Sequence, residues 1–99
     1  MAAARFVHAA RENMRTEAAS AIRCFQSGSA LGVRQNLELL SRQVERRARI
    51  ERNLLNIPTR TRPLKRAVSA AFDALGRGAF VRLGRVLDRV EALTRSDGH

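Results

Sequence analysis

Few side chains in this chain are suited to catalysis or to metal binding. The sequence has two histidines, His8 and His99, and one cysteine, Cys24. Neither histidine has a cysteine or carboxylate at zinc-ligand spacing, and a lone cysteine far from a histidine is not the pattern of a catalytic nucleophile. The glycines Gly76 and Gly78 are not followed by the residues of a nucleotide-binding loop. We therefore expect a protein that is not an enzyme and that uses no cofactor and no metal.

The side chains that stand out in this sequence are instead cationic. Eighteen of its nineteen basic residues are arginine. Guanidinium stays charged and grips phosphate or carboxylate through two parallel hydrogen bonds. Nine basic and two acidic residues fall between Ser41 and Arg66, so this stretch holds +7 of the formal net charge of +10. Such a concentration of charge indicates a polyanionic partner.

In this stretch, arginines recur on one face of a predicted helix and continue through a loop into the next helix. A strip of this kind follows a phosphate backbone, and it suits double-stranded DNA or structured RNA held without base reading. Single strands would require aromatic platforms, whereas the chain has no Trp or Tyr and its four Phe fall on predicted core stripes. The plain alternative is a solvated helix face. The candidate nucleic-acid-binding residues are Arg42, Arg46, Arg49, Arg60, Arg62, Lys65 and Arg66.

Length and composition predict one helical domain. The chain has 99 residues and is 44% hydrophobic, with Ala, Leu, Arg and Val dominant, which favours helix over sheet. One cysteine allows no internal disulfide, and no apolar run reaches the ~20 residues of a membrane span. We expect a cytoplasmic protein. The alternative is the mitochondrial matrix, because the N-terminus is rich in Ala, Arg and Ser.

Apolar periodicity and helix-breaking residues divide the chain into four predicted helices. Gly28 ends the first helix, Pro58 ends the second, Pro63 opens the third, and Gly76 and Gly78 bracket the last turn. The result is an all-α, small four-helix bundle of two αα-hairpins joined by a proline-containing linker. The predicted helices span about 3–25, 30–56, 63–75 and 79–94, with a tail at 96–99.

The second predicted helix carries two apolar lines, one for its own bundle and one for a partner chain or a fourth helix. Arg47 and Glu51 fall within this apolar arc and can pair with each other or with the same residues of a second copy. The alternative function is therefore a protein-binding adaptor, an antagonist of a regulator or an accessory subunit, present as a homodimer or a hetero-complex. The candidate partner-binding residues are Leu39, Arg47, Ile50, Leu54 and Ile57.

The two halves of the sequence resemble each other loosely. The segments 18–21 and 67–70 each lead to a glycine turn, after which Leu37 matches Leu87 once the register shifts by one residue. A duplicated hairpin produces this pattern, and so do two unrelated hairpins that follow the same rules.

In the last helix, Phe80 falls on the predicted core line with Leu83 and Leu87.

Overall fold

The computed structural model describes residues 2–54, 56 and 61–96, with side chains from residue 12 to residue 95 of these. The described residues form four helices and no strand, which confirms the all-α prediction. The helices are α1 (Ala2–Gln26), α2 (Ala30–Asn53), α3 (Arg62–Gly76) and α4 (Phe80–Ser96).

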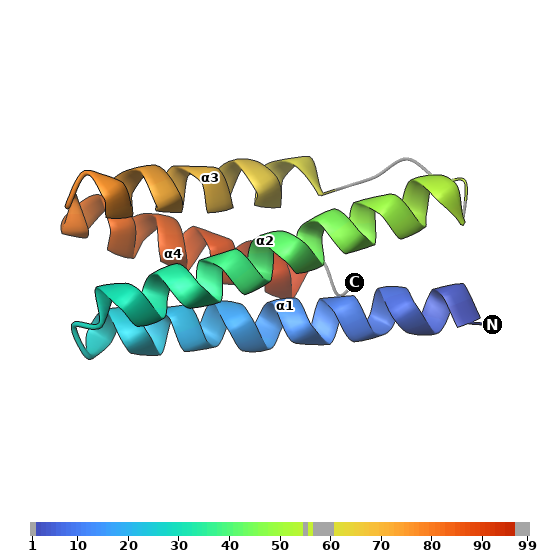
Figure 1. The fold of residues 1–99 in the computed structure, drawn as a ribbon, viewed down its shortest axis with the longest axis horizontal. Coiled ribbons are helices and arrows are strands. Elements are labelled where there is room, and N and C mark those ends of the chain that lie inside the picture. Colours follow the sequence, from blue (N-terminus) through green and yellow to red (C-terminus); the bar gives the residue numbers. More distant parts are fainter. Residues whose placement is uncertain (1, 55, 57–60, 97–99) are drawn as a thin grey trace.

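The four helices form an antiparallel bundle in which each helix packs against two others. α1 pairs with α2 and α3 with α4 as hairpins, and the hairpins meet through the α1–α4 and α2–α3 contacts. Figure 1 shows both hairpin turns at the same end of the molecule, whose extents are 41 × 21 × 19 Å. α1 and α2 are longer than α3 and α4, and in Figure 1 they run on past the start of α3.

Most predicted helix boundaries are confirmed to within two residues, but α2 ends earlier than predicted. Its last helical residue is Asn53, and the Leu54 N–H closes the helix by donating to the Ile50 carbonyl. Asn56, the predicted last residue, has a φ of +51°, which is a left-handed conformation that no α-helix continues. Pro58 lies outside the described residues. α3 begins at Arg62, one residue before the predicted start, so Pro63 is its second residue and still lies in the first turn.

The two turns are built alike and sit fifty residues apart. Gly28 and Gly78 have φ of +79° and +67°, which suits glycine because it has no Cβ. The Gly28 N–H donates to the Phe25 carbonyl, and the Gly78 N–H donates to Leu75 in the same way, at 3.1 and 3.2 Å. The offset is therefore a uniform fifty residues, and the one-residue shift suggested by the sequence is wrong.

The core repeats with the same offset. Buried residues in the first hairpin have buried counterparts fifty positions later, so the two hairpins press equivalent apolar stripes together. Burial of these side chains supplies most of the driving force for folding. The equivalent buried pairs are Met14 and Leu64, Ala18 and Val68, Ala21 and Ala71, Val33 and Leu83, Leu37 and Leu87, Leu40 and Val90, and Val44 and Thr94.

Phe80 departs from the predicted core line, since 57% of it is exposed. It occupies the first position of α4, at the end of the apolar stripe. At Gly84 of α4, a Cβ would lie 3.1 Å from the ring of Phe25 of α1. Glycine thus lets α1 and α4 approach closely.

Small and polar residues line the contact between α1 and α2. The Asn36 side chain of α2 donates to the Cys24 sulfur of α1 at 3.6 Å. Glu17, seven residues before Cys24, and Gln43, seven residues after Asn36, each bury a side-chain oxygen that has no hydrogen-bond partner among the described residues. Burial raises the pKa of Glu17. At Gly32, a Cβ would lie 2.7 Å from the Cys24 sulfur.

We predict that Gly32→Ala destabilises the fold although alanine is the better helix former. A Gly-to-Ala change inside a helix normally gains about 1 kcal/mol, but crowding against Cys24 and Ser29 should outweigh that gain and leave a net loss of about 1–2 kcal/mol. Because Cys24→Ala removes the closest clashing atom, the double variant should lose less than the sum of the single variants. Urea unfolding monitored by circular dichroism measures these differences.

Gly76→Ala is the matched control, because no atom lies within 4 Å of a Cβ at Gly76. This variant should be neutral or slightly stabilised. A Gly32→Ala variant as stable as Gly76→Ala would show that α1 and α2 are not in close contact at this level.

Candidate functional site

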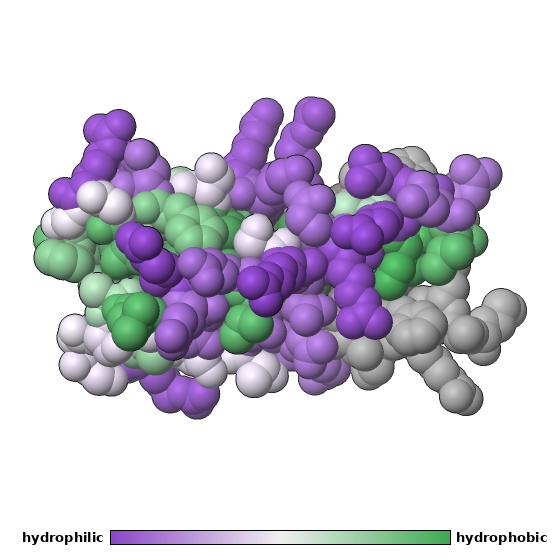
Figure 2. All heavy atoms as spheres, in the orientation of Figure 1, coloured by the Kyte–Doolittle hydropathy of each residue, from purple (hydrophilic) through white to green (hydrophobic). Residues whose placement is uncertain are grey.

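The predicted cationic residues that the structure describes all lie on the surface. Arg42, Arg46 and Arg49 occupy the exposed side of α2. Figure 2 shows hydrophilic side chains gathered along α2 and projecting from the α3 edge. Arg60 lies outside the described residues. The exposed members on α3 are Arg62, Lys65 and Arg66.

Five of these residues line three different grooves, and Arg42 lines none of the three. Arg46 and Arg49 line a groove near the end of α2. Lys65 faces the groove between α2 and α3. Arg62 and Arg66 line a groove between α3 and α4. The charge therefore forms a band around two edges of the bundle.

The ion pairs separate these cations into two groups. Lys65 Nζ lies 2.8 Å from Glu45 Oε1 in a bridge between α3 and α2. The hydrogen bond and charge of Lys65 hold the pKa of the Glu45 carboxyl below its ordinary value. By contrast, Arg42, Arg62 and Arg66 form no ion pair with a carboxylate of the described residues. The exposed guanidinium groups are thus better placed than Lys65 to receive an external anion.

The groove between α3 and α4 brings three arginines together. It has a volume of about 450 Å³, and Arg89 of α4 joins Arg62 and Arg66 along it, above Ala70 and Val86. Sequence reasoning missed Arg89 because it was assigned to a different helix from the cationic stretch. The signal was present, since Arg82, Arg85 and Arg89 recur at spacings of three and four residues and so share a helix face.

Packing does not require arginine at these three positions. The equivalent positions of the first hairpin, fifty residues earlier, hold Glu12, Thr16 and Leu39. The backbone there follows the same helix pairing, so an acid, a hydroxyl and an aliphatic side chain satisfy the same fold. The positive charge of the α3–α4 groove is a property of the second hairpin alone.

The structure places the predicted partner-binding residues in different environments, some buried and some exposed. Arg47 is only 2% exposed and Glu51 only 3% exposed. Arg47 Nε donates to Glu51 Oε1 at 2.6 Å, one helical turn away. Arg47 is therefore not part of an exposed docking surface: its charge is neutralised inside the chain, since a buried ion must be paired. Ile57 lies outside the described residues.

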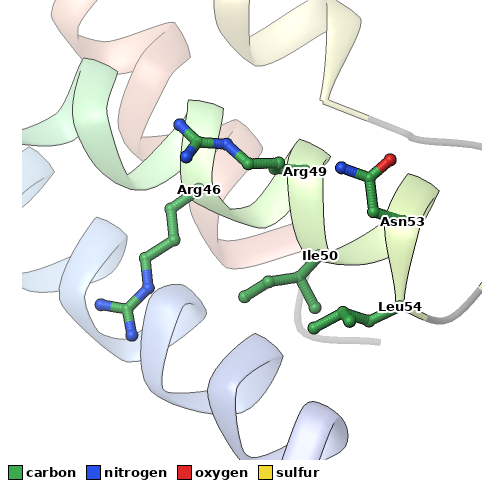
Figure 3. A pocket seen from close by; sticks show the side chains of 5 residues that line it. All are labelled: Arg46, Arg49, Ile50, Asn53 and Leu54. Atoms are coloured by element: carbon green, nitrogen blue, oxygen red, sulfur yellow. The ribbon is translucent and has the colours of Figure 1, made fainter.

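Ile50 and Leu54 form an apolar groove at the far end of α2. The groove has a volume of about 390 Å³ and is also lined by Arg46, Arg49 and Asn53. In Figure 3 the Ile50 and Leu54 side chains lie next to each other, while the Arg46 and Arg49 guanidinium groups point to opposite sides. Ile50 is mostly buried, whereas Leu54 is 65% exposed. Leu39 is also exposed but does not line this groove.

No site for metal chemistry is present in the described part of the chain, where no three His, Cys, Asp or Glu side chains gather. Cys24 is half-buried against α2 and accepts from Asn36. None of the described helices combines the length and apolarity needed to cross a bilayer. Compared with models of protein families, with curated proteins and with solved structures, the chain matches none of them.

We predict that the buried ion pair of Arg47 and Glu51 stabilises the fold only when both residues are present. Glu51→Leu leaves the Arg47 guanidinium buried beside an aliphatic side chain and should lower the free energy of unfolding by about 3 kcal/mol. Adding Arg47→Met should restore much of this loss, because the double variant buries no charge. Thermal and urea unfolding of the two single variants and the double variant measures the coupling. Two independent, additive losses would contradict a direct buried interaction.

Proposed function

We propose that this protein binds double-stranded DNA or structured RNA through arginine contacts to phosphates. The observation that supports this most strongly is the groove between α3 and α4, where Arg62, Arg66 and Arg89 gather around one hollow. A second support is that packing does not demand this charge, as the first hairpin demonstrates. The formal net charge of +10 adds long-range attraction for any polyanion.

The arrangement favours phosphate over base contacts. The three arginines lie on the outer sides of two neighbouring helices, so they follow a ridge of backbone instead of entering a groove of the duplex as a recognition helix does. Each phosphate neutralised releases condensed counterions, so the affinity falls steeply with salt. Arg42 and Arg49 on α2 extend the band and add sequence-independent attraction.

We predict that Arg66→Thr/Arg89→Leu weakens nucleic-acid binding without harming the fold. These substitutions carry the residues of the equivalent first-hairpin positions, Thr16 and Leu39. Removing two phosphate contacts should lower the slope of log K against log salt by about two and reduce affinity by about the same factor for unrelated sequences. Fluorescence anisotropy with two unrelated duplexes and one RNA hairpin, at several salt concentrations, measures both quantities.

The control is Arg15→Ala/Arg95→Ala, which removes the same amount of charge from residues paired with Glu12 and Glu91. It should leave the salt slope nearly unchanged. If both double variants reduced binding equally, net charge and not the α3–α4 groove would account for the affinity. If the parent bound none of the three probes at low salt, the nucleic-acid function would be wrong.

A second candidate function is protein binding at the groove formed by Ile50 and Leu54. The support for this candidate is an exposed leucine beside a hollow that is also lined by arginines, a residue type enriched in protein interfaces. On this proposal the chain is an adaptor, an antagonist of a regulator or an accessory subunit, and Arg46 and Arg49 face acidic groups of the partner.

We predict that Leu54→Asp abolishes a protein complex, or a homodimer, formed through this groove. A carboxylate there would remove an apolar anchor and become buried upon association, which weakens binding by more than about 2 kcal/mol. Sedimentation at high salt, which suppresses nucleic-acid binding, measures the association state. Leu39→Asp adds the same charge outside the groove and should have no effect. An association equally sensitive to both variants would exclude this groove as the interface.

A further inference from the structure

The end of the bundle that carries both turns exposes more apolar surface than its helices require. Leu31 is 66% exposed and Val81 is 76% exposed, and the two occupy equivalent positions in the first turns of α2 and α4. Side chains lean toward the N-terminus of their helix, so both lean toward the turn end. Figure 2 shows hydrophobic surface there, at the end where Figure 1 places the turns.

A cleft opens between the two turns. It has a volume of about 340 Å³, and all four helices or their turns contribute to its lining. Val33 and Leu83 belong to the core, Phe25 and Leu75 are partly buried against it, and Phe80 is 57% exposed at the edge. A space of this size bounded by apolar side chains accepts anchoring side chains from a partner.

Positive charge surrounds this apolar end. The segments 23–35 and 73–85 contain five arginines and one acidic residue, Asp73. Asp73 Oδ1 already accepts from Arg77 Nε at 3.1 Å. The other arginines of these segments, all exposed, are Arg23, Arg34, Arg82 and Arg85.

We propose that the turn end is a docking site for an amphipathic helix of a partner protein, with apolar anchors on one face and carboxylates beside them. The apolar residues enter the cleft between Phe25, Leu75 and Phe80, and the acidic residues face the surrounding arginines. Helices of this kind bind hydrophobic grooves through anchors spaced three, four and seven residues apart. The site lies at the turn end and is independent of the phosphate contacts proposed for the sides of the bundle.

Charge and chemistry select this occupant over two others. A second copy of the chain would bring the same arginine-rich end against this one, and like charges brought together oppose association. A nucleic acid suits this end less well. It would contact the guanidinium groups, but the exposed Leu31, Val81 and Phe80 side chains offer no hydrogen-bond donor to a phosphate. An acidic amphipathic helix satisfies both the apolar surface and the charge around it.

The experiment uses three synthetic helical peptides of about 20 residues that share one apolar face, with Leu and Phe at helical spacing. Their polar faces carry Glu, Gln or Lys. Anisotropy titrations with the full chain should rank the affinities Glu, then Gln, then Lys, with the Glu peptide binding at about 10–100 μM. Amide shifts in nuclear magnetic resonance spectra should concentrate in residues 25–33 and 75–83.

Two variants test the location of the site. Leu31→Ser/Val81→Ser changes only exposed side chains and should weaken binding of the Glu peptide about tenfold or more. Phe80→Ser should do the same, and circular dichroism shows whether each variant stays folded. Leu54→Ser is the matched control, because Leu54 is as exposed as Leu31 but lies at the other end of α2. It should bind the Glu peptide as the parent does.

Several results would overturn the proposal. They are equal affinity for the Glu and Lys peptides, parental binding by Leu31→Ser/Val81→Ser, and equal loss in Leu54→Ser. A concentration-dependent dimer that Leu31→Ser/Val81→Ser dissolves would assign this end to a second copy instead. Loss of peptide binding in Arg66→Thr/Arg89→Leu would likewise place the peptide on the α3–α4 groove and not at the turn end.

Discussion

Each αα-hairpin has an apolar stripe that it cannot cover by itself, and this constraint determines the rest of the structure. Two helices bury only the line along which they touch, so a hairpin with a wider stripe must find a second apolar layer. Here the second layer is another hairpin with buried residues at equivalent positions, such as Leu37 and Leu87. The pairing fixes the antiparallel order of the helices and brings the two glycine turns to one end.

This pairing also decides where the charges lie. Because the facing stripes take the apolar residues, most arginines are left on the outer edges of the helices, where they surround the bundle. Among the arginines whose side chains the structure describes, the exception is Arg47, which is buried in the last two turns of α2. There the core side of the helix carries an arginine and a glutamate, and the two neutralise each other.

The sequence predicts the helices well but the candidate site only in part. Helical periodicity identifies which face of each helix is buried, and glycine and proline mark the ends, so the four elements follow directly. Periodicity does not identify which helices become neighbours. For that reason Arg89 was separated from Arg66, although they line the same groove. The arginines of Ser41 to Arg66 were expected on one strip, whereas Arg46 and Arg49 line one groove and Arg62 and Arg66 line another. Phe80 was assigned to the core because a stripe does not reveal where the opposite helix stops.

Comparing equivalent positions of the two hairpins distinguishes residues that the fold requires from residues that a binding partner would require. Positions that match in both hairpins, such as Gly28 and Gly78, perform the same packing or turn role twice. Positions that differ in charge, such as Leu39 and Arg89, are not constrained by that role. By this criterion the arginines of the α3–α4 groove are additions to the scaffold. The exposed Leu31 and Val81 are different, since an apolar side chain is present at both equivalent positions although neither is buried. Neither side chain is part of the core, so the exposed pair supports the docking site proposed for this end of the bundle.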